Sequence, residues 1–366
     1  MQSRLGHESS IALDLVTLAA AVIVIIGMRE LASVLVPALT SIFFLLAFLP
    51  LVVWLRSKGV SPGWSKVIAI GLAVAMLIGI VVLVAVSVTQ LAEGLPEYEE
   101  QLRDRVGGLS GWLSDQGINI SSDEAADELD FNTMLDLGIR FIPGVVSAAV
   151  ATLLSLVIFV YALIDVERTH QRLSLGLGES NPQLTQFSRM VSIVSRYIAI
   201  RAVLGAMAAI LDTILLLTLG VEYALFWGFV SFIMSFIPYV GYWVAVVPPM
   251  LLALATGGWT TAALVFIGYL LINGAIDSLV GPNLMGRGLD ITPAVTVLSI
   301  VFWGAILGPM GAILAMPLTV GFKILLLERS PNARWLALLV STGDGTAALE
   351  AQPAQPLISS ESMSSE

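Results

Sequence analysis

Long apolar runs separated by short polar segments make up most of the chain. The runs cover residues 11–28, 31–55, 67–91, 141–164, 191–219, 223–255, 260–280 and 292–327. As helices, runs of about 20 residues are long enough to cross a hydrocarbon core of about 30 Å. Helices suit a bilayer because they satisfy their backbone hydrogen bonds internally. The pattern therefore predicts an all-α polytopic membrane protein with about eight transmembrane helices.

Charge, proline and glycine subdivide this pattern. Only Arg29 and Glu30 separate the first two runs, which predicts a tight helical hairpin. The third run is expected to end before Pro96, and Pro143 is expected to begin the fourth, because proline suits the first turn of a helix. We expect N-terminal membrane spans in 1–91, an extracytoplasmic amphipathic insert in 92–140, a membrane transport core in 141–328, and a cytoplasmic, largely disordered tail in 329–366.

The insert is the one sizeable polar segment. Between Glu93 and Arg140 it carries twelve acidic residues and three basic ones. Apolar residues recur at steps of three or four from Leu95 to Leu113, which predicts an amphipathic helix. Its apolar face would cap the membrane domain or pack on a neighbouring subunit. The alternative is a solvated linker with one surface helix.

Basic residues gather beside alternate runs, as they do in cytoplasmic loops. They are Arg56, Lys58 and Lys66, then Arg168, Arg172, Arg189, Arg196 and Arg201, and finally Arg329 and Arg334. All of them fall on one side of the membrane if the N-terminus is cytoplasmic. We therefore predict a multi-pass protein of the bacterial cytoplasmic (inner) membrane with both termini in the cytoplasm.

Composition excludes several classes of protein. Hydrophobic residues make up 57% of the chain and charged residues only 12%, which excludes a soluble enzyme. The net charge of -10 argues against a nucleic-acid partner, because phosphates are bound by surplus Lys and Arg. There is no cysteine, and His7 and His170 are far apart, so we predict no metal site and no cofactor. The chain has no phosphate-binding glycine loop and no Ser–His–Asp set, so neither an ATP-driven pump nor an enzyme is expected.

Clusters of proline and glycine interrupt two of the runs, at residues 236–242 and 281–288. Proline removes a backbone donor, so the freed groups need partners inside the protein. Transporters use such broken helices to bind solutes and ions, although a plain proline kink or a loop at the membrane surface is the alternative. The candidate substrate-binding residues are Pro238, Tyr239, Gly241, Asn273, Gly281, Pro282, Asn283 and Arg287.

Two carboxylates lie within apolar runs. Asp212 lies well inside residues 191–219, and Asp277 follows Asn273 near the second break. A charge at the centre of a membrane helix costs about 2.5 to 3.5 kcal/mol on insertion scales, so such residues usually face a cavity, another charge or a proton path. Both are candidates for ion or proton coupling, and the alternative for Asp212 is a neutral acid bonded to a neighbouring helix. Arg201 is deep enough to be a partner for an anionic group.

The C-terminal half contains three ordered motifs, at residues 220–228 with 236–241, 282–289, and 297–304 with 307–318. These motifs resemble the autoinducer-2 exporter (AI-2E) family of bacterial membrane transporters, whereas the N-terminal half agrees only in layout. The resemblance implies some re-entrant helices and a homo-oligomer, with a pentamer as the expected form. Members are associated with export of the quorum-sensing furanone autoinducer-2, and others with sodium and proton exchange.

One departure from the family concerns the second break. Many members have a glutamate just before the proline of the second motif, or a Glu-Gly pair a few residues upstream. Here those places hold Gly281 and the pair Ile276 and Asp277. If the family's acid binds a coupling cation, Asp277 replaces it or the cation is not used.

We predict a secondary membrane transporter that exports a small polar signalling molecule such as autoinducer-2. One alternative is a sodium (lithium)/proton antiporter. The other is a non-transporting envelope scaffold that binds partners through residues 92–140. The expected partners are a small polar solute, sodium or protons, the lipid bilayer and further copies of the chain.

Overall fold

The structure is a computed structural model that describes residues 16–17, 19–20, 22–115, 131–178, 181–285, 291–328 and 340–342. These residues form helices and turns, and no strand occurs among them. The segments long and apolar enough to cross a membrane include Ala32–Ser57, Pro62–Ser87, Pro182–Thr218 and Val240–Leu284. The predicted all-α polytopic membrane fold is confirmed.

The N-terminal helices do not form the expected hairpin. Residues 22–30 are helical and lead into helix α2 (Ala32–Ser57). The Leu31 amide donates to the Gly27 carbonyl at 3.0 Å, and the Leu35 amide donates to the Leu31 carbonyl at 2.9 Å. The helical hydrogen-bond pattern therefore passes through Arg29 and Glu30 without a reversal, and the hairpin prediction is wrong. Arginine and glutamate are both good helix formers, so a charged pair alone does not end a helix.

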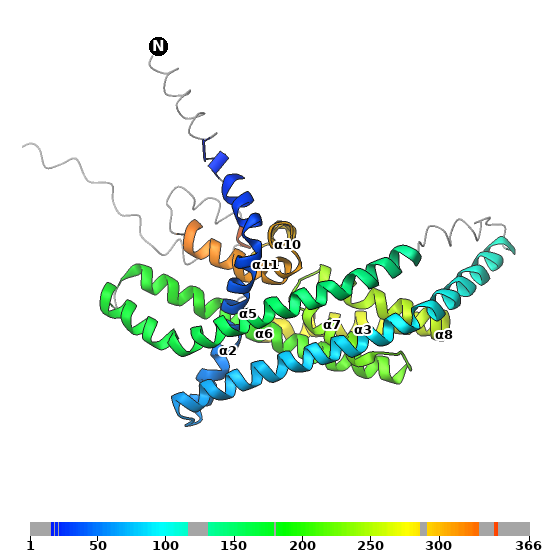
Figure 1. The fold of residues 1–366 in the computed structure, drawn as a ribbon, viewed down its shortest axis with the longest axis horizontal. Helices are drawn as coiled ribbons and strands as arrows, with labels where there is room; N and C mark the ends of the chain where they lie inside the picture. The colour runs from blue at the N-terminus through cyan, green and yellow to red at the C-terminus, as the bar shows by residue number, and fades with distance from the viewer. Residues whose placement is uncertain are drawn as a thin grey trace, which may run out of the picture.

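Two very long helices extend beyond the predicted spans. Helix α3 (Pro62–Asp115) has 54 residues and runs through Pro96, and helix α5 (Phe131–Leu177) has 47 and runs through Pro143. They lie side by side along the long axis in Figure 1. The helix ends expected at these prolines are wrong, because a helix satisfies its own backbone in lipid and in water alike. The polar composition after residue 92 therefore reflects a change from lipid to water around the helix, while the backbone stays helical.

Helix α6 (Pro182–Thr218) follows α5 after a short turn. Asn181 caps it, since its side chain accepts a hydrogen bond from the Gln183 amide at 2.8 Å, and Pro182 occupies the first turn. Helix α6 packs against α2, against helix α7 (Ala224–Met234) and against helix α8 (Val240–Ala275). It is therefore the central element around which the C-terminal half is built.

The predicted basic groups meet at one end of the helices. Arg56 and Lys66, at the α2–α3 turn, both form ion pairs with Glu167 of α5. Arg189, near the start of α6, pairs with Glu328 at 3.4 Å. These contacts bring together the ends that the sequence assigns to one side of the membrane. That this side is the cytoplasm stays a prediction, as do the domain division and the position of both termini.

Helix α8 is two arms joined at Gly258. The φ of 79° and ψ of −173° at this residue interrupt the helix in a conformation that is essentially limited to glycine. The second arm returns along the first, because Tyr269 and Val265 are buried in the same cluster as Ala245. The chain then continues as a π-helix, η1 (Ile276–Val280), and the short helix α9 (Gly281–Met285).

A second helical hairpin closes the described core. Helices α10 (Pro293–Leu307) and α11 (Pro309–Phe322) have 15 and 14 residues and meet at Gly308, with φ 71° and ψ −159°. Each is about 22 Å long and so is shorter than a hydrocarbon core of about 30 Å. The pair matches the re-entrant segments expected in this half of the chain. A π-helix, η2 (Lys323–Leu327), follows α11.

Candidate functional site

The first predicted helix break lies between α7 and α8. Helix α7 ends at Met234 and α8 begins at Val240, so the break at residues 236–242 is confirmed. The Val240 amide donates to the Pro238 carbonyl at 2.7 Å, while Tyr239 has φ 64° and ψ −53°. This is the rare, strained form of the γ-turn. A non-glycine residue held in such a conformation marks a site that the surrounding structure maintains at a cost.

Gly241 allows this turn to be so tight. A Cβ atom at this position would lie 1.9 Å from the Met234 carbonyl oxygen. Only a residue without a side chain lets the start of α8 pass so close to the end of α7. Gly241 therefore shapes the site through its backbone.

The second predicted break is milder than expected. Gly281 is in a right-handed helical conformation, with φ −53° and ψ −54°, and it begins helix α9. The irregularity lies one turn earlier, where residues Ile276–Val280 form the π-helix η1. Because Pro282 has no amide hydrogen, the helix changes its hydrogen-bond spacing just before it. Such π segments occur often at functional sites.

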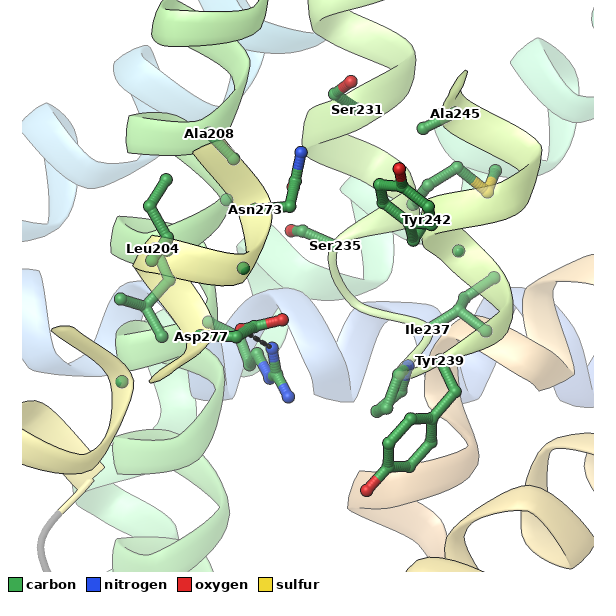
Figure 2. A pocket seen from close by; sticks show the side chains of 18 of the residues that line it. Leu204, Ala208, Ser231, Ser235, Ile237, Tyr239, Tyr242, Ala245, Asn273 and Asp277 are labelled. Carbon is green, nitrogen blue, oxygen red and sulfur yellow. Dashed lines mark hydrogen bonds and ion pairs between the residues drawn. The ribbon is translucent and has the colours of Figure 1, made fainter. Parts of the chain in front are cut away.

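A cavity of about 680 Å³ lies between these two irregular segments. Its walls come from α6, the α7–α8 turn, both arms of α8, and η1 with α9, and Thr296 of α10 and Met316 of α11 complete them. Figure 2 shows Asn273 and Asp277 on one side, facing Tyr242 and Ile237 on the other. A cavity of this size at broken membrane helices is the expected form of a transporter's solute site.

An ion pair lies at one side of the cavity. The Arg201 Nη1 atom of α6 is 3.3 Å from the Asp277 Oδ1 atom of η1, and this pair is the dashed contact at Asp277 in Figure 2. The Arg201 side chain is 17% exposed, whereas that of Asp277 is 64% exposed. The Arg201 guanidinium carbon also lies 6.0 Å from the centre of the Tyr197 ring. Asp277 is therefore neutralised by Arg201 while it remains open to water.

The other predicted carboxylate lies behind the cavity wall. Asp212 is completely buried, and the Asn273 Nδ2 atom lies 3.4 Å from both of its carboxylate oxygens. The same amide donates to the Tyr269 carbonyl at 2.9 Å. The hydroxyl of Tyr242 is buried without a hydrogen-bond partner in the part of the chain that the structure describes. Asn273 thus connects a buried acid to the cavity.

The structure brings most of the predicted site residues together. Those that line the cavity are Pro238, Tyr239, Gly241, Asn273, Asp277, Gly281 and Pro282. Asn283 is exposed, and its side chain donates to the Leu279 carbonyl at 2.7 Å instead of facing the cavity. Arg287 lies outside the described residues. The roles of all these residues stay predictions.

Several lining residues carried no signal in the sequence as members of a site. They are Tyr197, Ser231, Ser235 and Thr296. Isolated hydroxyl residues are common in membrane helices, where they often bond to their own backbone, as Ser235 does with the Phe232 carbonyl at 2.7 Å. Among the lining residues of α6, the sequence indicated only Arg201, because it lies deep within an apolar run.

Comparison with known proteins shows the family. The family described as AI-2E family transporter matches residues 16–329. The chain belongs to the AI-2E transporter family. It is 28% identical over 324 residues to the AI-2 transport protein TqsA of Escherichia coli (strain K12), covering 87% of this chain and 93% of that protein. This AI-2E chain is accordingly a multi-pass membrane transporter.

Two other relatives carry less specific names. The putative transport protein YhhT of Escherichia coli (strain K12) is 26% identical over 329 residues, or 90% of this chain and 94% of that protein. The putative transport protein YrrI of Bacillus subtilis (strain 168) is 24% identical over 309 residues, or 81% and 86%. All of these names describe transport, which agrees with the prediction that the AI-2E chain is not an enzyme.

Proposed function

We propose that this AI-2E protein is a secondary transporter that exports a small polar solute, such as autoinducer-2, through the cavity beside the α7–α8 turn. The observation that carries the proposal is the cavity itself, about 680 Å³ in volume and bordered by two irregular helical segments. The relative named as an AI-2 transport protein supports the choice of solute.

The cavity wall suits a hydroxyl-rich solute. The strained turn at Tyr239 lies beside the cavity, and Asn273 and Tyr242 supply side-chain donors and acceptors. Apolar residues such as Leu204 and Ile237 fill the remainder of the wall. A few polar groups in a mainly apolar wall orient a small solute without holding it so tightly that release fails.

Coupling to an ion would use Asp212 and Asp277. A second candidate function, sodium (lithium)/proton antiport, is favoured by one observation: Asp212 is completely buried and contacts an amide rather than a cation. A carboxylate in such a place either holds a proton or binds a small cation through oxygen ligands. Both candidates keep the cavity as the pathway and differ in what crosses.

The surroundings of the proposed transporter follow from its exposed surface. Large apolar side chains such as Ile210, Leu217 and Val301 are exposed on α6 and α10. Lipid of the inner membrane, or further copies of the chain in a homo-oligomer such as a pentamer, would cover them. Native mass spectrometry from detergent gives the subunit number.

Everted membrane vesicles test the export proposal. Vesicles with the full chain should accumulate added autoinducer-2 faster than vesicles without it, and Asp277→Asn should alter the dependence of this flux on pH and sodium. Asp165→Asn is the matched control, because Asp165 is an exposed acid outside the cavity that pairs with Arg168. Equal accumulation with and without the protein would reject autoinducer-2 as the solute.

Proteoliposomes that contain a pH dye test the antiport candidate. Addition of sodium or lithium should drive protons across the membrane in the wild type and not in Asp212→Asn. If neither ion moves protons, antiport is excluded while export remains open.

A further inference from the structure

Arg201 is the cationic side chain of the cavity. Among the described residues that line the cavity, no other carries a positive charge. The residue is mostly buried, and its Nε atom is inaccessible to water and without a hydrogen-bond partner in the described residues. A guanidinium has five N–H donors, and Asp277 accepts a hydrogen bond from one of them at 3.3 Å. Arg201 can therefore donate to more than one oxygen of a bound anion.

The contact between Arg201 and Asp277 has the features of a weak pair. Charge-assisted hydrogen bonds are usually about 2.7 to 2.9 Å long, whereas this one measures 3.3 Å. The Asp277 side chain is 64% exposed, so water competes for its carboxylate. The pair joins α6 to the π-helix η1 through one hydrogen bond. Another anion of suitable size could replace Asp277 without dismantling the helices.

Tyr197 adds a second polar group on the same side. It precedes Arg201 by one helical turn in α6, and its buried hydroxyl lies within reach of the Arg201 guanidinium. Its ring lies 6.0 Å from the guanidinium carbon of Arg201. One face of α6 thus presents a guanidinium and a phenol hydroxyl to the cavity.

We propose that Arg201, with Tyr197, binds an anionic oxygen group of the transported solute, and that Asp277 occupies this position until the solute displaces it. The inference rests on the proposed transport function and specifies its solute as a small, oxygen-rich monoanion. Charge decides the class. An anion that displaced Asp277 would replace one negative charge beside Arg201 by another, whereas a neutral solute would form only weaker, uncharged hydrogen bonds with the guanidinium.

Asp277 is the charged group that competes with the solute for Arg201. The described charged and titratable groups of the cavity are Tyr197 and Arg201 on α6, Tyr239 in the turn, Tyr242 on α8 and Asp277 on η1, and Asp212 lies behind Asn273. Helices α9, α10 and α11 contribute none among their described lining residues. Asp277 is the acid that pairs with Arg201, so its displacement frees the guanidinium for the solute.

Equilibrium binding to the purified full-length chain tests the proposal without any transport step. The probe is lactate, its neutral match is lactamide, and inorganic phosphate serves as a second anion. Isothermal titration calorimetry would be run on the wild type, Asp277→Asn, Arg201→Gln and Arg201→Lys. Asp165→Asn again controls for loss of an exposed acid.

The two partners should respond in opposite directions. Asp277→Asn should bind at least one anionic probe about tenfold more tightly than the wild type, because a competing charge-assisted hydrogen bond is gone. Arg201→Gln should abolish binding, Arg201→Lys should restore part of it, and lactamide should not compete.

A gain of affinity cannot result from misfolding, so Asp277→Asn decides the test even if Arg201→Gln is unstable. If the ion pair is only structural, both variants lower the melting temperature and neither changes anion affinity, which overturns the proposal. Absence of binding by both anions to Asp277→Asn overturns it as well. Opposite responses together with no autoinducer-2 flux would keep the anion site and reject only the solute named above.

Discussion

The two carboxylates of the transport core, Asp212 and Asp277, share a chemistry and differ in everything around them. Asp212 is fully buried between α6, α7 and α8 and contacts the Asn273 amide. Asp277 belongs to a π-helix at the cavity, is 64% exposed and pairs with Arg201. Asp212 is shielded from water by the surrounding helices, whereas Asp277 has a counter-charge and stays accessible to water.

This difference suggests a division of labour. An acid without water or a cation is most stable when it is protonated or bound to an ion, so a change at Asp212 is coupled to the packing of three helices. An acid that has both water and a cationic partner, as Asp277 does, can exchange its partner without disturbing the fold. Mutations should therefore affect the folding of the first region and the binding properties of the second.

The largest effect is expected where a mutation separates the helices around Asp212. Gly228 of α7 faces the turn of α6 that contains Ala209 and Thr213. A Cβ atom at position 228 would lie 1.8 Å from the Thr213 Oγ1 atom and 2.9 Å from the Ala209 carbonyl oxygen. Gly228→Ala should destabilise the protein by about 3 kcal/mol in unfolding titrations with SDS in mixed micelles. Gly274→Ala is the control, because nothing lies within 4 Å of its added Cβ, and it should be neutral or stabilising. Equal stabilities would show that α6 and α7 can move apart freely.

A smaller loss is expected when Asp212 itself is changed. Asp212→Ala leaves one hydrogen of the Asn273 amide without an acceptor in the interior and should cost about 2 kcal/mol. Asp212→Asn keeps a hydrogen-bonding group of the same shape and should cost less than about 1 kcal/mol. The same SDS titration measures both variants. An Asn variant as unstable as the Ala variant would mean that the negative charge, rather than the hydrogen bond, stabilises this region.

Changes at the cavity acid should scarcely affect the fold. Asp277→Asn removes an exposed partner of an ion pair and should change the free energy of unfolding by about 0.5 kcal/mol or less. Thermal unfolding in detergent, compared with Asp212→Ala, measures this difference. A destabilisation as large as that of Asp212→Ala would make Asp277 a structural residue and remove the contrast.

Glu167 provides the baseline for an acid outside the membrane. Partial burial tends to raise its pKa, but hydrogen bonds and charges from Lys66 and Arg56 outweigh this effect and hold the pKa below its ordinary value. A lowered pKa in the folded protein means that the stabilisation exists above the unfolded pKa and is lost as the pH falls through the folded one. Since Glu167 is 41% exposed, Glu167→Gln should cost less than about 1 kcal/mol at neutral pH. The difference between wild type and variant should vanish in acid, and a difference that grew in acid would contradict the assignment.

Features that depend on nearby residues were predictable from the sequence. Pro238 and Gly241 act on the backbone at their own positions, so the α7–α8 break could be located. Asn273 and Asp277 are four residues apart and therefore share a helix face, which explains why both reach the cavity. The repeated apolar runs indicated membrane helices for the same local reason.

Features that depend on packing or on helix ends were not predictable. Asp212 meets Asn273 across 61 positions and Arg201 meets Asp277 across 76, and nothing in either neighbourhood marks its partner. Polar composition also does not end a helix: the backbone stays helical at Arg29 and Glu30 and far beyond residue 92. The pattern of apolar residues reports the surrounding medium, whereas helix ends depend on backbone hydrogen bonds that the pattern does not show.

The 54-residue length of α3 has a mechanical consequence. At 1.5 Å per residue the helix measures about 81 Å, so about 50 Å extends past a hydrocarbon core of about 30 Å. Because α5 runs alongside it, the extension is a pair of helices that acts as a stiff lever (Figure 1). A tilt of about 10° within the bilayer would swing its tip by about 9 Å. Small rotations of the membrane helices would thus become displacements large enough to follow with a fluorophore pair attached to the arm and to a membrane helix of the same chain.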